Sequence, residues 1–187
     1  MQKEVLVPIA DGTEELEAVT LIDVLRRAGA RVTVASVGGM QVTASRGVKL
    51  VADCLIRDCL RMRYDLVALP GGMPGAEHLR DDPPLREILA RQAREERWLA
   101  AICAAPAVVL APHGLLGERR ATCHPAFVDQ LPNRSAADER VVVDGHLVTS
   151  RGPGTALEFA LRLVVMLYGR EYAESVALPL VPAPGTL

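Results

Sequence analysis

Leu99-Ala-Ala-Ile-Cys-Ala-Ala-Pro-Ala-Val-Val-Leu110 joins an apolar run to a run of small, helix-forming residues. The pattern predicts a buried strand that turns sharply into a helix, with the Cys103 thiol at the corner. Pro106 suits the first helical turn, where a missing N–H group costs little. Because the unpaired N–H groups at a helix start favour an anion, we expect the pKa of Cys103 to lie below that of a free cysteine. The alternative is that Cys103 is only a small buried hydrophobic residue.

The composition favours a single α/β domain. The chain has 187 residues, of which 50% are hydrophobic and only 3% are aromatic, so its core must consist mainly of valine, leucine, isoleucine and alanine. These residues are typical of a parallel sheet that is covered by helices. We therefore predict a flavodoxin-like, doubly wound, mainly parallel sheet with helices on both faces.

Charge and cysteine usage disfavour several classes of function. The formal net charge is −2 with both signs interspersed, so specific nucleic-acid binding is not expected. There is no run of about eighteen uncharged apolar residues and no basic-then-apolar leader, which predicts a soluble, cytoplasmic protein without membrane contact. Four scattered cysteines form neither a disulfide scaffold nor a zinc spacing, so no structural metal is expected.

The first part of the chain has a β-α-β pattern, with strands at 5–10 and 31–37 around an amphipathic helix. We expect Thr13 to cap this helix and Gly29 to end it. Two strands in this order over about 35 residues imply a right-handed parallel crossover.

The remaining elements are weaker or shorter. Up to the Cys103 corner, we expect short strands at 41–44 and 48–52, a strand at 65–69 and a helix from 82 to about 96. After it, we expect a strand at 120–123, a helical turn at 126–131 and a hairpin of 140–143 with 146–149. The chain then continues with a helix from a Thr155–Glu158 capping box to 168 and a short helix near 171–177. No internal repeat or linker divides the chain.

Chemistry-bearing residues follow three of the predicted strands. The loops 11–17 and 70–75 and the Cys103 corner all lie after strands, and sites in open parallel sheets lie beyond the carboxyl ends of the strands. We therefore expect a carboxylate, a glycine pair and a thiol to converge at one place.

Four motifs in these loops carry a resemblance to a known family: Ala10-Asp-Gly-Thr-Glu-Glu-Leu-Glu17, Leu69-Pro-Gly-Gly72, Ala101-Ile-Cys-Ala-Ala-Pro106 and Thr149-Ser-Arg-Gly-Pro-Gly-Thr155. They resemble the ThiJ/PfpI superfamily, in the branch with the Parkinsonism-associated deglycase and its bacterial YajL-like relatives. The similarity runs in order from about Lys3 to Val181. It implies one such domain over residues 1–181 and an extended tail at 182–187.

The resemblance also implies roles for individual residues. Cys103 matches the reactive nucleophile, Glu17 the carboxyl group that hydrogen-bonds the sulfur, and His124 a histidine near the site whose role is less settled. The other matching positions are Gly72 and Ala104, whose backbone N–H groups face an oxyanion, and Arg46 and Arg151, near the pocket and the dimer contact.

Two residues next to Cys103 bear on which activity of the superfamily is expected. Ala104 follows the cysteine where peptidases of the superfamily place a histidine, which disfavours a peptidase. Ala105 stands where a glycine is often found, as in YajL-like members. Without the resemblance, Glu17 would be a surface acid that complements the helix dipole. The other cysteines (Cys54, Cys59 and Cys123) are expected to be structural, and the remaining histidines to be surface or hairpin residues.

Three functions remain in competition. The resemblance implies a cofactor-independent enzyme that acts on reactive dicarbonyls such as methylglyoxal, as a glyoxalase or a deglycase of glycated thiols and amines. The second is a redox-sensing chaperone in which Cys103 is oxidised to a sulfinate, and a weaker third is a hydrolase or peptidase. Two adjacent negative charges would repel, so we expect an ionised Cys103 beside a protonated Glu17. The family also implies a homodimer, which the apolar residues of the first helix favour because they exceed one face.

Overall fold

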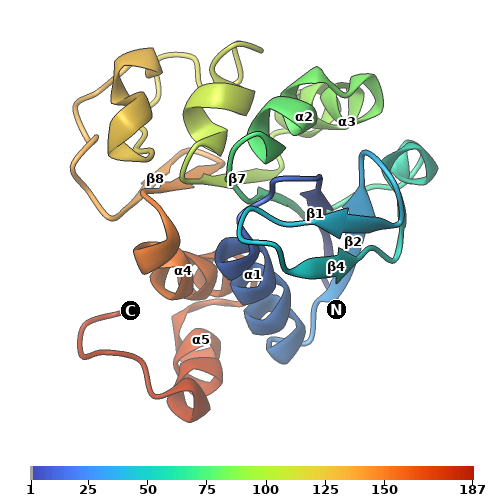
Figure 1. The fold of residues 1–187 in the computed structure, drawn as a ribbon. Helices are drawn as coiled ribbons and strands as arrows, with labels where there is room; N and C mark the ends of the chain where they lie inside the picture. The colour runs from blue at the N-terminus through green and yellow to red at the C-terminus, as the bar shows by residue number, and fades with distance from the viewer. Residues whose placement is uncertain (1) are drawn as a thin grey trace.

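A seven-stranded sheet forms the centre of the computed structural model, which describes residues 2–187 (Figure 1). The strand order is β5-β2-β1-β6-β7-β9-β8, and every neighbouring pair is parallel except β8 and β9. The strands are β1 (Glu4–Ile9), β2 (Arg31–Ser36), β5 (Cys54–Leu55), β6 (Leu66–Leu69), β7 (Trp98–Ile102), β8 (Val141–Asp144) and β9 (Leu147–Ser150). The short strands predicted at 41–44 and 48–52 form a separate antiparallel hairpin of β3 (Gln41–Thr43) and β4 (Lys49–Val51).

Helices cover both faces of this sheet. One layer consists of α1 (Glu15–Arg27), α4 (Ala156–Tyr168) and α5 (Arg170–Ala177). The opposite layer consists of α2 (Gly75–Asp81), α3 (Pro83–Arg94) and the helical segment η2 (Pro106–Leu110). Short helical turns complete the chain at η1 (Ile56–Cys59), η3 (Pro125–Gln130), η4 (Pro153–Thr155) and η5 (Leu178–Leu180). The predicted α/β class, with helices on both faces, is confirmed.

The central strands are buried on both sides, which explains their unbroken apolar runs. All four residues of β6 are inaccessible to solvent, as are residues 100–102 of β7. Burial between two helical layers requires apolar residues at every position of a strand. None of the described helices has the length and apolar character needed to cross a membrane.

The direction of strand order reverses beside β1. The chain passes from β1 to β2 on one side and returns to β6 on the other side, and β7 follows β6. The carboxyl ends of β1, β6 and β7 therefore meet at one edge, where a topological switch point forms a crevice. The expected convergence of the three loops is confirmed.

Both predicted helix caps are wrong, because the threonine hydroxyls bind elsewhere. Helix α1 begins at Glu15 after Glu14, and the Thr13 hydroxyl instead accepts a hydrogen bond from the Ala10 N–H group (2.9 Å). Helix α4 begins as expected after Thr155, but that hydroxyl meets Ser150 and Gly152, and Glu158 pairs with Arg140. The helix predicted to open at residue 82 is confirmed as α3, and its N-cap is Asp82, whose carboxylate accepts from the Leu85 N–H group.

Two local predictions differ from the structure. Residues 120–123 are extended but form no strand, because their N–H groups bind side chains: Arg120 donates to Asp144 and Thr122 donates to Thr149. Helix α2 lies between the predicted loop 70–75 and the helix predicted from 82, in a segment for which no element was predicted. It begins at Gly75, whose backbone packs directly against that of Thr13.

Candidate active site

Cys103 follows β7 directly, and its backbone is held from both sides. Its N–H group donates to the Ser150 carbonyl oxygen (3.0 Å), and its own carbonyl accepts from the His124 N–H group (2.8 Å). The φ angle of Cys103 is 63°, a left-handed conformation that is rare for a residue other than glycine. This sharp turn aims the side chain back over the end of the sheet, so the predicted strand–helix corner is confirmed.

Glu17 projects from the first turn of α1 into the protein and is fully buried, at 0% exposure. Its Oε2 atom accepts a 2.8 Å hydrogen bond from the Gly71 N–H group. Its Oε1 atom accepts no well-formed hydrogen bond from the described residues. The carboxyl group lies close enough to the Cys103 thiol for each to change the pKa of the other. The structure therefore joins the predicted acid and thiol.

Burial controls the ionisation of Glu17. Its pKa is raised from 4.5 to about 7, chiefly by loss of hydration and in small part by the nearby Glu14 charge, while the Gly71 and Cys103 hydrogen bonds oppose the shift. A carboxyl group with this pKa exchanges its proton near neutral pH, which suits a general acid and base.

The expectation of an easily ionised thiol is wrong for this resting site. Burial, followed by the charge of Glu17 and its hydrogen bond, raises the pKa of Cys103 to about 12. The N–H groups of Gly72 and Ala104 lower it, as a helix start should, but they do not overcome the desolvation of a side chain only 9% exposed. Glu17 therefore has the lower pKa of the two groups, and it exchanges its proton near neutral pH while the thiol stays neutral.

Two adjacent glycines allow the loops to approach closely. A Cβ atom on Gly71 would lie 2.7 Å from the Cys103 Cβ and 2.9 Å from the Ala104 nitrogen. Gly72 has a φ of 88°, and a Cβ atom there would overlap the backbone of Gly12 and Glu14. The Gly71 N–H group thus donates to the Glu17 carboxyl group, and the Gly72 N–H group faces the Cys103 sulfur. Sequence reasoning identified Gly72 but missed the role of Gly71, which only the close packing reveals.

A pocket of about 300 Å³ opens over this corner. Of the predicted residues, Cys103, Gly72, Ala104, His124 and Arg46 line it. The other lining residues are Glu14, Ser45, Met73, Phe127 and Pro153.

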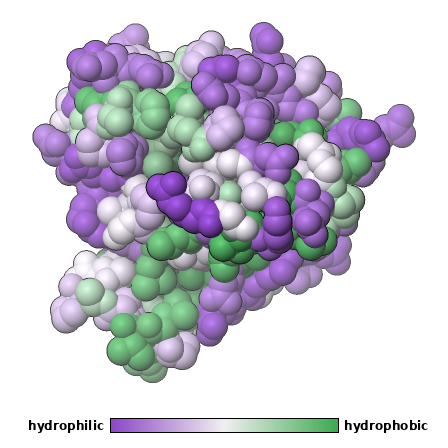
Figure 2. All heavy atoms as spheres, in the orientation of Figure 1, coloured by the Kyte–Doolittle hydropathy of each residue, from purple (hydrophilic) through white to green (hydrophobic). Residues whose placement is uncertain are grey.

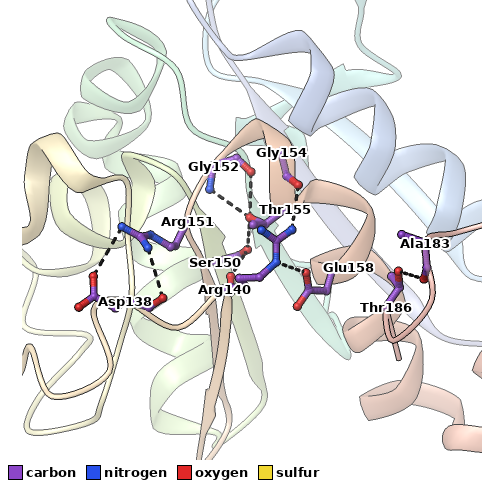
Figure 3. Close-up of polar contacts among 10 residues, drawn as sticks. All are labelled: Asp138, Arg140, Ser150, Arg151, Gly152, Gly154, Thr155, Glu158, Ala183 and Thr186. Carbon is purple, nitrogen blue, oxygen red and sulfur yellow. Dashed lines mark hydrogen bonds and ion pairs between the residues drawn. The ribbon is translucent and has the colours of Figure 1, made fainter.

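Arg151 does not line this pocket. Its guanidinium points toward Asp138, at 3.8 Å from the carboxylate and 3.2 Å from the carbonyl oxygen (Figure 3). Its predicted role in binding substrate therefore has no direct contact to support it. The nearby His124 ring accepts a hydrogen bond on Nδ1 from the Ala126 N–H group (3.2 Å), which leaves Nε2 to carry the proton of a neutral imidazole.

The β3–β4 hairpin forms part of the pocket wall because acidic side chains at the start of α1 anchor it. The Ser45 hydroxyl contacts the carboxylates of Glu14 (2.6 Å) and Glu15 (2.9 Å), and the Arg46 N–H group donates to Glu15 (2.9 Å). Burial opposes the charge of Glu15, but these hydrogen bonds together lower its pKa. Sequence analysis did not assign Glu14, Glu15 or Ser45 to the site.

A hydroxyl network rigidifies the loop after β9. The Ser150 hydroxyl lies 2.6 Å from the Thr155 hydroxyl and donates to the Arg140 carbonyl oxygen (Figure 3). Thr155 also accepts from the Gly152 N–H group (3.2 Å). This network fixes the carbonyl of Ser150, which receives the Cys103 N–H bond. Among residues 2–187, no three His, Cys, Asp or Glu side chains gather as metal ligands.

The chain matches the model of a known protein family. The model of the DJ-1/PfpI family matches residues 3–166. The chain belongs to the DJ-1/PfpI family. Protein DJ-1 homolog B of Arabidopsis thaliana is 53% identical over 169 residues, which are 90% of this chain but 39% of that protein, so the chain spans well under half of its length.

Two further DJ-1 relatives match nearly end to end. A glutathione-independent glyoxalase of Caenorhabditis elegans, DJR-1.2, is 37% identical over 94% of each chain. The solved structure of oxidized Toxoplasma gondii DJ-1 is 48% identical, covers 97% of this chain and 99% of its own, and superimposes with a TM-score of 0.94. The DJ-1/PfpI fold and family are therefore shown for this chain.

Proposed function

We propose that this protein is a cofactor-independent enzyme that converts reactive dicarbonyls such as methylglyoxal to 2-hydroxy acids such as lactate. One observation carries the proposal: a fully buried carboxyl group with a pKa of about 7 adjoins a thiol at the floor of an open pocket. The printed name of the nematode relative, a glutathione-independent glyoxalase, supports the same chemistry.

The first step is addition of the thiol to the aldehyde. The Glu17 carboxylate accepts the Cys103 proton as the sulfur attacks the aldehyde carbon, so no free thiolate has to accumulate. The carbonyl π bond breaks and its oxygen gains negative charge. The N–H groups of Gly72 and Ala104, which already face the sulfur, stabilise this oxygen as a hemithioacetal forms.

An internal redox change follows. A base removes the proton from the former aldehyde carbon, and a proton is returned to the neighbouring ketone carbon, giving a thioester of the hydroxy acid. The aldehyde carbon is oxidised and the ketone carbon reduced, so no external oxidant is needed. Water then cleaves the thioester, releases the acid and restores the thiol. Glu17 is the acid–base group with a suitable pKa for these transfers.

Two further pocket residues are assigned supporting roles. His124, with its proton on Nε2, donates a hydrogen bond to a substrate or product oxygen from across the pocket. Arg46 lines the same space and attracts the developing carboxylate. Substitution of His124 by alanine should reduce turnover in part, whereas a complete loss would make His124 the general base instead of Glu17.

The test is lactate formation from methylglyoxal by the purified protein. We expect Cys103→Ser to lower turnover by about 100-fold or more and to leave the circular dichroism spectrum unchanged. Cys123→Ala is the matched control, because that thiol is also buried but does not line the pocket. Equal activity of the Cys103 variant would overturn the proposal.

The same assay separates the competing functions. Release of lactate from a glycated thiol faster than the adduct dissociates by itself would extend the proposal to a deglycase. Absence of turnover with any dicarbonyl, together with suppression of client aggregation, would favour the redox-sensing chaperone.

We further propose that the protein forms a homodimer in the cytoplasm. Leu16 and Val19 on α1 are 51% and 47% exposed, and Val51 on the adjoining β4 is 69% exposed. Apolar side chains gather over α1 and its border with the β3–β4 hairpin (Figure 2). A surface of this kind commonly marks a protein interface. Sedimentation as a monomer at micromolar concentration would rule out the dimer.

A further inference from the structure

Cys54 and Cys59 form a pair of thiols at the edge of the sheet, away from the pocket. Cys54 lies in the edge strand β5, and Cys59 ends the helical turn η1 that follows it. Their sulfur atoms are 3.6 Å apart, and both thiols are free. Two sulfur atoms at this distance are in direct contact, so no other group separates them.

The two thiols differ in their access to solvent. Cys54 is partly exposed, whereas Cys59 is fully buried, at 0% exposure. A reagent in solution therefore reacts with Cys54 first, and the buried Cys59 contacts the Cys54 sulfur from the protein side. This arrangement resembles an attacking and a resolving cysteine.

Little structure has to move for the sulfurs to join. Strand β5 has only two residues and pairs with β2 at only two positions, Ala35 with Cys54 and Ser36 with Leu55. The segment between the two cysteines contains four residues, most of them in the short turn η1. The sulfurs need to approach by only about 1–2 Å to reach bonding distance, and the partly exposed Cys54 on the short edge strand is the side that can move.

We propose that Cys54 and Cys59 are a redox modification site, independent of Cys103, that a small neutral disulfide converts to an intramolecular disulfide. Four strand spacings separate β5 from β7, or about 19 Å at 4.8 Å each. The pair therefore reacts without involving the pocket.

The exchange proceeds in two balanced steps. Cys54 loses its proton and attacks one sulfur of the small disulfide, whose S–S bond breaks and whose departing thiolate takes up a proton. Cys59 then loses its proton and attacks the Cys54 sulfur, which releases the second small thiol. Two protein thiols give up two electrons and two protons, and one small disulfide becomes two thiols.

The surroundings of Cys54 determine the rate of this reaction and the charge of the disulfide that suits it. Burial, contact with Cys59 and the charges of Asp58 and Asp53 raise the pKa of Cys54 to about 12. Little thiolate is present at neutral pH, so the reaction is slow and anionic reagents are repelled. A neutral disulfide is for this reason a better probe than an anionic one.

The sequence provides a direct readout, because Arg57 lies between the two cysteines. Trypsin cleaves after Lys49, Arg57 and Arg61, which places Cys54 on the peptide 50–57 and Cys59 on the peptide 58–61. Only a disulfide keeps these two peptides together. Folded Cys103→Ala protein would be treated with hydroxyethyl disulfide, alkylated in denaturant, digested and analysed by mass spectrometry.

We expect the linked peptide pair to become the main form of these cysteines. In the Cys59→Ser variant, Cys54 should instead keep a stable mercaptoethanol adduct, whereas in Cys54→Ser the buried Cys59 should stay unmodified. A persistent adduct on Cys54 in protein that retains Cys59, or two unmodified peptides after prolonged treatment at raised pH, would overturn the proposal. Because no dicarbonyl activity is measured, the outcome is independent of the proposed function.

Discussion

The Gly71 N–H group donates a 2.8 Å hydrogen bond to Oε2 of the buried Glu17. This bond fixes one carboxyl oxygen and leaves the other side of the group to the Cys103 thiol. A carboxyl group held in this way has a fixed position but a raised pKa of about 7, because burial outweighs the hydrogen bonds from Gly71 and Cys103. Its protonation state therefore changes within the range of ordinary assays.

Turnover should follow the ionisation of Glu17. If the carboxylate is the general base, kcat/KM for methylglyoxal should fall about tenfold for each pH unit below 7 and level off above 7. A pH profile of initial rates between pH 5 and 8 measures this directly. A flat profile would show that another group accepts the thiol proton.

The protonation of Glu17 should also affect stability, but in the opposite direction: the ionised form supports turnover, whereas the protonated form stabilises the fold. The folded-state pKa of Glu17, about 7, is above the value of 4.5 for an unburied carboxyl group, so the folded state binds more protons between these values. The free energy of unfolding should therefore fall as the pH rises from 4.5 to 7, by up to about 3 kcal/mol. Urea titrations at pH 5 and pH 8 test this. The Glu17→Gln variant is the control, because it should lose this part of the pH dependence.

Glu17→Gln should also make the thiol easier to ionise. The substitution removes the negative charge that, after burial, contributes most to the raised pKa of Cys103. We expect the thiol pKa to fall below about 12 while turnover decreases, because glutamine cannot accept the proton. Absorbance of the thiolate against pH gives the first quantity and lactate formation the second. An unchanged thiol pKa would mean that burial alone sets it.

Gly71→Ala should damage the site more than the fold. The added methyl group meets the Cβ of Cys103 and the nitrogen of Ala104, which are backbone-linked atoms that cannot rotate away. We expect a destabilisation of about 1–3 kcal/mol and a loss of most turnover. Gly38→Ala is the matched control, because its nearest neighbour would be 4.0 Å away. Equal activity of the two variants would contradict the close packing.

Thr155→Val tests the hydroxyl network beneath Cys103. Valine leaves the Gly152 N–H group without its acceptor and removes one of the two hydrogen bonds of the buried Ser150 hydroxyl, which keeps its bond to the Arg140 carbonyl oxygen. This loss should cost about 1–3 kcal/mol in thermal or urea unfolding. Thr186→Val serves as the control: its hydroxyl bonds only the Ala183 carbonyl in the exposed tail (Figure 3). We expect that control to be neutral, and equal effects at both positions would contradict the role of the network.

Much of this architecture is predictable from the sequence because local and long-range signals agree. The apolar runs before Cys103 and Pro70 can only be buried strands, and Gly29 ends a helix as expected. Family motifs then assign Glu17 to the thiol, although a first-turn glutamate would ordinarily face water.

The errors share a physical cause, which is competition for polar groups between distant segments. Thr13 and Thr155 have the spacing of helix caps, but loop N–H groups and Ser150 bind their hydroxyls. The start of α2 depends on contact between Gly75 and Thr13, which no local pattern encodes. For Cys103, the sequence indicates the helix start but not the extent of burial, so the direction of its pKa shift was predicted wrongly.

The left-handed backbone of Cys103 has a consequence for how this chain can evolve. A side chain in that conformation costs about 1 kcal/mol or more relative to glycine, which adopts it freely. Replacement by glycine would therefore relieve strain in the fold while removing the sulfur. Selection for stability favours glycine at this position, whereas selection for reactivity favours cysteine. A cysteine that persists there in a descendant sequence is therefore retained for its chemical reactivity and not for its contribution to folding.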